Sequence, residues 1–157
     1  MINIIVACDR NNLIGNNGKL PWIIPEDWEY FLNTTKDGVL IMGRKCYFDF
    51  EEYAKEREVI GLSQNPDFDF PHARKAHSLA ESLSIAKKIG KEIWICGGQR
   101  IYEEALPLAD RLYLTEINAE FTGDVYLPDW TKHFTKEISK RVLNTDRFKL
   151  TFRVFGK

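Results

Sequence analysis

The chain has 157 residues, of which 44% are hydrophobic and 29% are charged. That length fits one domain, residues 1–157, whose core buries about two-thirds of the surface of the extended chain. The 22 basic and 23 acidic residues are spread evenly and leave a net charge of −1, so the chain lacks the basic footprint of proteins that bind nucleic acid or an anionic membrane. We therefore expect a small-molecule ligand, with no nucleic-acid or membrane partner.

Short apolar segments of β type alternate with helical patterns along most of the chain. The predicted strands are residues 2–8, 39–42, 59–62, 93–96, 112–117 and 150–155, and the predicted helices are residues 25–35, 44–53, 78–89 and 98–106. Ser78, followed three residues later by Glu81, forms a capping box at the start of the third helix. Strands that are apolar on both faces and alternate with helices are typical of a mainly parallel sheet with helices on both faces. After residue 117, Gly123 and Pro128 precede two β-like stretches with no helix between them, which indicates an antiparallel C-terminal edge on this α/β fold.

The cysteines and the first apolar segment indicate a cytoplasmic location. Cys8, Cys46 and Cys96 are widely spaced and form no Cys-x-x-Cys pair, so reduced thiols are the simplest interpretation. Residues 4–8 are too short for the hydrophobic region of a signal peptide and are followed at once by two charged residues. The three histidines show no ligand-like spacing among themselves or with the cysteines, so we expect no metal site.

Asp27 is the first candidate functional residue. It lies four residues before Phe31 in the predicted helix, so the two side chains share one helix face. An acid in the first turn of a helix often only complements the helix dipole and faces water. Glu26 can meet that requirement alone, however, and aromatic residues are dense around Asp27 in the sequence. These residues by themselves leave open both a solvated acid and a binding site.

Two predicted strands run directly into glycine and then into a helix. One strand ends at Gly97-Gly98 and the other at Gly43-Arg44-Lys45. Glycine at such a junction lets backbone amides approach a phosphate group at the helix N-terminus. A glycine pair is more often only a turn, and the Gly-x-Gly-x-x-Gly fingerprint of a standard dinucleotide-binding domain is absent. Two junctions with Arg and Lys nearby nevertheless suit a dinucleotide with an extra phosphate, such as NADP. The alternative is that Arg44 and Lys45 only form the solvated start of a helix.

The order and spacing of short motifs carry a family resemblance. The motifs are Ala7, Leu13-Ile14-Gly15, Leu20-Pro21-Trp22, Pro25 with Asp27 and Phe31, Ile41-Met42-Gly43-Arg44-Lys45, Arg57, Leu62-Ser63, Gly97-Gly98 with Ile101-Tyr102, Leu112-Tyr113-Leu114-Thr115, and Gly123-Asp124 with Pro128. Each motif is weak alone. In this order and spacing they are specific, and the chain resembles dihydrofolate reductases along nearly its whole length.

The resemblance implies a folate site built around Asp27. This residue is expected to accept hydrogen bonds from the 2-amino group and a ring nitrogen of the pterin, because a carboxylate offers two acceptors to that donor pair. Thr115 is expected to hold the acid in place. Ile5 and Phe31 are expected to pack against the pterin and benzoyl rings, and Arg57 to bind the α-carboxylate of the glutamate tail.

The resemblance also implies that the cofactor is NADPH. The expected cofactor-binding residues are Ala7, Ile14, Gly43, Arg44, Lys45, Cys46, Ser63, Gly97, Gly98, Gln99, Arg100 and Ile101. Among them, Arg44, Lys45 and Ser63 are expected to hold the 2′-phosphate of the adenine ribose. Residues 97–101 are expected to face the pyrophosphate and the nicotinamide.

The implied reaction is hydride transfer from NADPH to carbon 6 of 7,8-dihydrofolate, with a proton added at nitrogen 5, which places the chain in tetrahydrofolate biosynthesis and one-carbon metabolism. Asp27 is the expected catalytic acid, and water is expected to carry the proton to nitrogen 5. A loop is expected to gate access of that water. Its residues are Asn16, Asn17, Gly18, Lys19, Leu20 and Trp22.

Several residues depart from the family pattern. Cys46 replaces a usual threonine, which removes a hydroxyl contact to the cofactor, and Cys96 replaces a branched aliphatic residue. Residues 49–56 lack a proline-rich turn, and Ala54 replaces a leucine of the benzoyl pocket. Trp28 is bulkier than the usual leucine and can fill part of the space beside Ala54. These changes leave the fit of the glutamate tail open.

Two other functions remain as alternatives. A riboflavin-pathway pyrimidine reductase resembles this fold and also uses NADPH, but it does not need Asp27, Phe31 and Thr115 together. A catalytically silent nucleotide-binding protein would show a lost acid or a broken cofactor junction, and neither is seen. Members of this family of similar length are usually monomers, so we expect a monomer.

Overall fold

The computed structural model describes residues 1–157, which form ten strands and four helices. The strands are β1 (Ile2–Cys8), β2 (Leu13–Gly15), β3 (Val39–Gly43), β4 (Glu58–Leu62), β5 (Arg74–Ala76), β6 (Ile93–Ile95), β7 (Arg111–Ile117), β8 (Val125–Tyr126), β9 (Lys136–Asn144) and β10 (Lys149–Gly156). The helices are α1 (Pro25–Thr35), α2 (Arg44–Ala54), α3 (Leu79–Ile89) and α4 (Gln99–Ala105). None of the four helices has the combination of length and apolar character that crossing a membrane requires.

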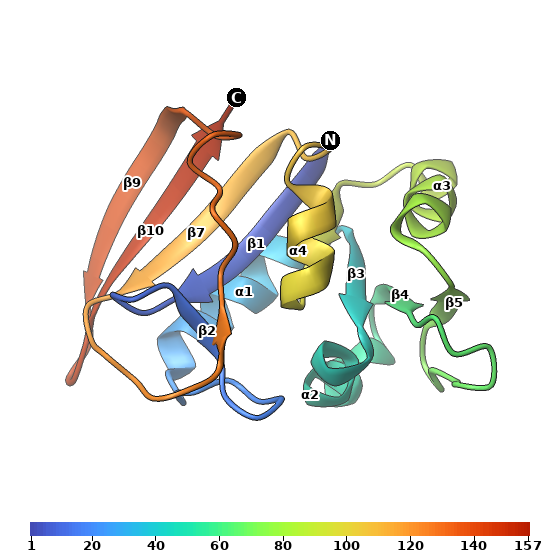
Figure 1. The fold of residues 1–157 in the computed structure, drawn as a ribbon, viewed down its shortest axis with the longest axis horizontal. Coiled ribbons are helices and arrows are strands. Elements are labelled where there is room, and N and C mark those ends of the chain that lie inside the picture. The colour runs from blue at the N-terminus through green and yellow to red at the C-terminus, as the bar shows by residue number, and fades with distance from the viewer.

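Eight strands form one sheet, in the order β5-β4-β3-β6-β1-β7-β10-β9 (Figure 1). The first six strands in this order run parallel. Strand β10 is antiparallel to β7, and β9 is antiparallel to β10. A small second sheet pairs β2 with β8. The α/β class, the mainly parallel sheet and the antiparallel C-terminal edge predicted from the sequence are confirmed.

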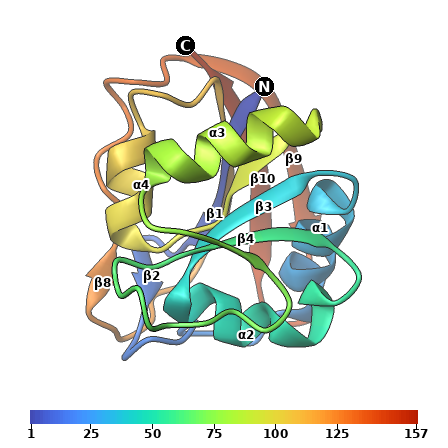
Figure 2. The same cartoon turned by 90° about the vertical axis from the view of Figure 1, so that its right-hand side faces the viewer.

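The strands are apolar on both faces because both faces are covered. Successive side chains of a strand point to opposite faces, and β3 shows the division clearly. Val39 and Ile41 belong to the core cluster that includes side chains of α3 and α4, whereas Leu40 and Met42 belong to the cluster that includes α2 and receives α1. Figure 2 shows α4 and α1 on opposite sides of the strands. Helices on both faces leave the carboxyl ends of the parallel strands free to form a site.

The predicted helices and the six predicted strands agree with the structure to within one residue at each end. Strands β2, β5 and β8 were not predicted, because each has only two or three residues and depends on a distant partner for its hydrogen bonds. Strand β9 is the first of the two β-like stretches expected after Pro128, and it lies at the exposed edge of the sheet.

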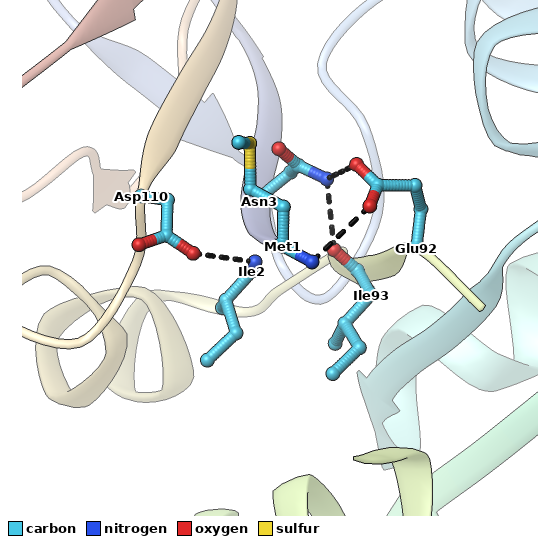
Figure 3. Close-up of polar contacts among 6 residues, drawn as sticks. All are labelled: Met1, Ile2, Asn3, Glu92, Ile93 and Asp110. Carbon is cyan, nitrogen blue, oxygen red and sulfur yellow. Dashed lines mark hydrogen bonds and ion pairs between the residues drawn. The ribbon is translucent and has the colours of Figure 1, made fainter. Parts of the chain in front are cut away.

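Polar contacts fix the amino end of β1 between its neighbours (Figure 3). The Ile2 backbone N–H donates to Asp110 Oδ2 at 2.8 Å. The Asn3 amide is fully buried, and its Nδ2 donates to Glu92 Oε1 and to a backbone carbonyl of β6, each at 3.2 Å. Because the two acids precede β7 and β6 respectively, these contacts align all three strands at one end.

Candidate active site

A cavity of about 360 Å³ opens beside the carboxyl ends of β1, β3 and β6 and is bordered by α1 and α2. Of its 24 lining residues, 14 are hydrophobic, so a charged group inside it is poorly solvated. The cavity is large enough for a small organic ligand. No group of three or more potential metal-ligating side chains occurs in the chain.

Asp27 lines this cavity rather than facing bulk water. Helix α1 begins at Pro25, which occupies the first turn without losing a needed hydrogen bond, and Asp27 follows in that turn. Burial raises the pKa of Asp27 from 3.8 to about 6, and a hydrogen bond with the Thr115 side chain partly opposes this rise. Thr115 also lines the cavity, from β7, and is 2% exposed. The geometry favours a binding site over a solvated dipole partner.

Aromatic side chains form one wall of the cavity. Trp28 and Phe31 of α1 stack with ring centroids 5.4 Å apart, and Phe31 meets Phe50 of α2 edge to face at 5.7 Å. Trp28 also contacts Tyr53 at 5.7 Å. With Ile5 of β1, the rings of Trp28, Phe31 and Phe50 make an apolar slot in the cavity that Asp27 also lines, whereas Tyr53 lies outside the lining.

The two glycine junctions meet at another wall of the cavity. The Gly43 backbone N–H donates to the Gly97 carbonyl at 2.9 Å. Gly97 and Gly98 line the cavity, and a Cβ atom added at Gly98 would meet no atom within 4 Å. The backbone here is therefore open to a ligand group. The Tyr102 hydroxyl lies 2.8 Å from the carbonyl of Cys96 and fixes the strand that leads into this junction.

The remaining predicted cofactor residues divide into two groups. Those that line the cavity are Ala7, Ile14, Lys45, Cys46 and Gln99. Those outside it are Gly43, Arg44, Ser63, Arg100 and Ile101. Arg100 is exposed and pairs with Glu104, and Ile101 is 8% exposed in the main core cluster. Because Arg44 and Ser63 follow β3 and β4, they lie along the same sheet edge as the cavity.

The predicted gating loop borders the cavity through Gly18, Lys19 and Leu20. Asn16 and Lys19 exchange backbone hydrogen bonds of 2.8 and 3.0 Å, which close a tight turn. A Cβ atom at Gly18 would lie 3.3 Å from the Lys45 side chain, so the turn rests against the first turn of α2.

Three residues of the loop, Asn16, Asn17 and Trp22, lie outside the cavity lining. The Asn17 backbone N–H donates to Asp124 Oδ1 at 3.0 Å, which ties the loop to the chain just before β8. Trp22 is 6% exposed, and its Nε1 is a buried donor without a partner. The gating role of the loop remains a prediction.

A model of the dihydrofolate reductase family matches residues 1–157. The chain belongs to the dihydrofolate reductase family. Similar relatives include the dihydrofolate reductases of Staphylococcus haemolyticus and Bacillus subtilis, which are 36% identical to this chain over 143 and 139 residues respectively. Each match covers 88% of this chain and 82% of the relative. Among solved structures, dihydrofolate reductase from Enterococcus faecalis complexed with NADP(H) and RAB-propyl matches with a TM-score of 0.86 at 28% identity, covering 99% of this chain and 95% of that one. The resemblance read from the motifs is confirmed.

Two departures from the dihydrofolate reductase pattern, Cys46 and Ala54, and the expected tail-binding residue Arg57 can be located in the structure. Cys46 Sγ lies 3.3 Å from the Cys96 carbonyl, and burial raises the pKa of the Cys46 thiol to about 12, so this thiol is neutral at physiological pH. Ala54 is 1% exposed and does not line the cavity. Arg57 donates to the Thr35 hydroxyl at 3.1 Å and also lies outside the cavity lining, so its role toward a glutamate tail remains a prediction.

Several lining residues were not among the predicted site residues. They are Val6, Gly15, Trp28, Tyr30, Met42, Asp49, Phe50, Cys96, Tyr102 and Val125. A helical signal could have found two of them, because Asp49 and Phe50 lie four residues after Lys45 and Cys46 and so share a face of α2 with them. Burial raises the pKa of Asp49, and the positive charge of Lys19 in the loop partly opposes this rise.

Proposed function

We propose that this chain catalyses the NADPH-dependent reduction of 7,8-dihydrofolate to 5,6,7,8-tetrahydrofolate. The observation that carries the proposal is the Asp27 carboxylate, held with Thr115 inside a mostly apolar cavity that also reaches the Gly97-Gly98 junction. Membership of the dihydrofolate reductase family supports it. One site thus offers an acceptor for a pterin and open backbone for a dinucleotide.

In this proposal Asp27 binds and orients the pterin. Its two oxygens accept from the 2-amino group and a ring nitrogen, and the Thr115 hydroxyl holds the carboxylate in place. Phe31 and Ile5 pack against the flat rings, and Trp28 and Phe50 extend the slot toward the benzoyl group. Arg57, at the far end of α2, is the cation assigned to the tail carboxylate.

The residues at the glycine junctions fit NADPH. Gly98 leaves open space for a ligand, and Arg44 and Lys45 have no hydrogen-bonding or ion-pair partner within the protein. When bound, NADPH supplies the hydride that is added to carbon 6 of the pterin. Gly97 and Gly98 present backbone to the cofactor, Cys46 and Gln99 border it, and Arg44, Lys45 and Ser63 receive the 2′-phosphate.

Asp27 also serves as the source of the proton. Because burial raises its pKa to about 6, Asp27 carries a proton at pH 7 more often than a carboxyl group in water does. Water relays the proton to nitrogen 5, and the loop of residues 16–20 controls its access by lying against Lys45. The apolar lining keeps other water away from the reacting atoms.

One assay tests the function directly. The loss of NADPH absorbance is measured on adding dihydrofolate, and is compared with NADH as reductant and with a riboflavin-pathway pyrimidine as substrate. We expect rapid oxidation with NADPH and dihydrofolate, slower oxidation with NADH, and none with the pyrimidine. No oxidation with any pair, despite NADPH binding, would indicate a silent nucleotide-binding protein.

The chain is also proposed to act as a cytoplasmic monomer without a nucleic-acid partner. The three cysteines carry free thiols, as reduced cytoplasmic proteins do, and the charge balance offers no basic surface. Sedimentation at micromolar concentration tests the oligomeric state, and a dimer would contradict this part of the proposal.

A further inference from the structure

Arg44 is held in place by an aromatic ring and by no hydrogen bond. Its guanidinium carbon lies 4.5 Å from the centroid of the Phe68 ring, within the range of a cation–π contact. The hydrogen bonds and ion pairs of the structure include none from Arg44, whereas Arg10, Arg57 and Arg153 all donate to acceptors within the protein. All five N–H donors of Arg44 are therefore free for a ligand.

Phe68 itself rests on a buried aromatic base. It lies in the segment between β4 and β5, and its ring meets Phe70 at 4.9 Å and Phe48 at 5.8 Å, both edge to face. Phe70 is 5% exposed and packs edge to face on Tyr47 at 5.1 Å. The Tyr47 hydroxyl accepts the backbone N–H of His72 at 2.9 Å, which fastens the segment to α2. The ring beneath Arg44 is thus fixed on both sides.

The sheet register places Arg44 beside other groups that suit an anion. Gly43 pairs with Leu62, and Leu62 pairs with Ala76, so the next residue of each strand lies at the same edge. Those next residues are Arg44, Ser63 and His77. His77 Nδ1 lies 3.4 Å from the Ser63 carbonyl, so the imidazole and the serine are neighbours. A guanidinium, a hydroxyl and an imidazole in one row form a suitable cradle for a phosphate dianion.

We propose that Phe68 is a positioning residue for the reductase reaction, which holds the Arg44 guanidinium ready for the 2′-phosphate of NADPH and so increases the preference for NADPH over NADH. The proposal rests on the proposed function, because it needs NADPH as the cofactor. A free arginine side chain loses rotamer freedom when it binds, and a stacked one has lost part of it already. The Phe68 ring covers a face of the guanidinium. The N–H donors of the guanidinium lie at its edge, where a phosphate can accept two hydrogen bonds from them.

The test compares dissociation constants for NADPH and NADH, measured by isothermal titration calorimetry. Phe68→Leu keeps an apolar side chain but removes the ring. We expect NADPH binding to weaken about two- to fivefold, the effect of an exposed cation–π contact, with NADH binding unchanged. Phe68→Tyr should keep the parent preference. In an Arg44→Ala background, Phe68→Leu should have no further effect on either cofactor.

A matched control uses the same kind of contact elsewhere. Arg147 lies 5.5 Å from the Phe148 ring, at the turn between β9 and β10, and Phe148→Leu should leave both dissociation constants unchanged. Melting temperatures of all variants are measured, and Phe68→Met replaces the leucine variant if that variant is unfolded at the assay temperature. Equal loss for both cofactors, or full retention of the NADPH preference, overturns the positioning role. Absence of dihydrofolate reduction in the parent overturns the proposed function instead.

Discussion

At the scale of single residues, Asp27 shows how one group can serve function at a cost to stability. A carboxylate inside an apolar cavity is poorly solvated, so burial raises the pKa of Asp27 to about 6. Thr115 supplies the opposing hydrogen bond, but it does not restore the pKa to 3.8. The same burial that keeps a proton available therefore disfavours the ionised folded state at neutral pH.

Asp27→Asn should lower dihydrofolate turnover at pH 7 by roughly a hundredfold or more, the range typical of a lost acid–base group. An amide has only one acceptor oxygen and cannot match the two pterin donors or carry the proton. NADPH affinity should not change, because in the proposed function Asp27 contacts the pterin and not the cofactor. Glu26→Gln, one residue earlier in the same helical turn, is the control and should keep parent turnover. Turnover of Asp27→Asn within a few-fold of the parent would remove Asp27 from the mechanism.

The stability of the parent should also depend on pH through Asp27. The pKa of Asp27 is raised in the folded state, so its contribution to stability is fully present below pH 3.8 and is lost as the pH rises through about 6. The difference between these values corresponds to roughly 3 kcal/mol. Asp27→Asn should therefore be more stable than the parent at pH 7.5, and this gain should vanish toward pH 4. Urea unfolding at both pH values measures it, and a gain that is equal at both would contradict the burial argument.

At the scale of elements, α3 shows local signals acting together. The Ser78 hydroxyl accepts the Glu81 backbone N–H at 3.0 Å, and Glu81 Oε2 in return accepts the backbone N–H of His77 at 3.1 Å. The predicted capping box is therefore present, with the return bond made one residue earlier than in the usual pattern. At the other end, Gly90 has φ of 81° and ends the helix in the left-handed conformation that glycine adopts readily.

Ser78→Ala should lower the free energy of unfolding by about 1 kcal/mol, because it leaves a helix N–H without its acceptor. Ser84→Ala is the matched control, since Ser84 is exposed in the middle of the same helix and alanine is the better helix former there. Denaturant unfolding compares the two variants. A cost for Ser84→Ala equal to that of Ser78→Ala would show that capping is not the cause.

Elements with local signals could be predicted, and those that depend on distant partners could not. The bounds of the buried strand β1 and of the helix α1 could be predicted to the residue. The strand is a continuous apolar segment, and the helix begins at a proline. Strand β5 pairs with β4 and covers only three residues, one of them buried, so it leaves no pattern. The site divides in the same way. Asp27 and the glycine junctions could be inferred from residue type, whereas Val125 reaches the cavity only through the pairing of β8 with the distant strand β2.

At the scale of the whole molecule, the sheet joins the hydrophobic clusters into one structure. A cluster of 22 buried residues and a cluster of 10 lie against opposite faces of the same strands. Strand β3 contributes alternate side chains to both, so neither cluster can lose its packing without disturbing the other. This arrangement supports the proposal that residues 1–157 act as one domain.

We therefore expect one cooperative thermal transition for the ligand-free protein. Its enthalpy should be roughly 110 kcal/mol near 60 °C for 157 residues. Scanning calorimetry should give a calorimetric enthalpy equal to the van't Hoff enthalpy. Two resolved transitions would contradict the single domain.

The aromatic wall of the cavity contains a tryptophan whose fluorescence should report ligand binding. Trp28 lies in that wall, stacked on Phe31, whereas Trp130 packs on Phe155 at 4.7 Å and does not line the cavity. A ligand that enters the slot changes the surroundings of the Trp28 indole and leaves those of the Trp130 indole unchanged. Folate binding should therefore quench part of the intrinsic fluorescence, and Trp28→Phe should remove most of that response while leaving the emission of Trp130.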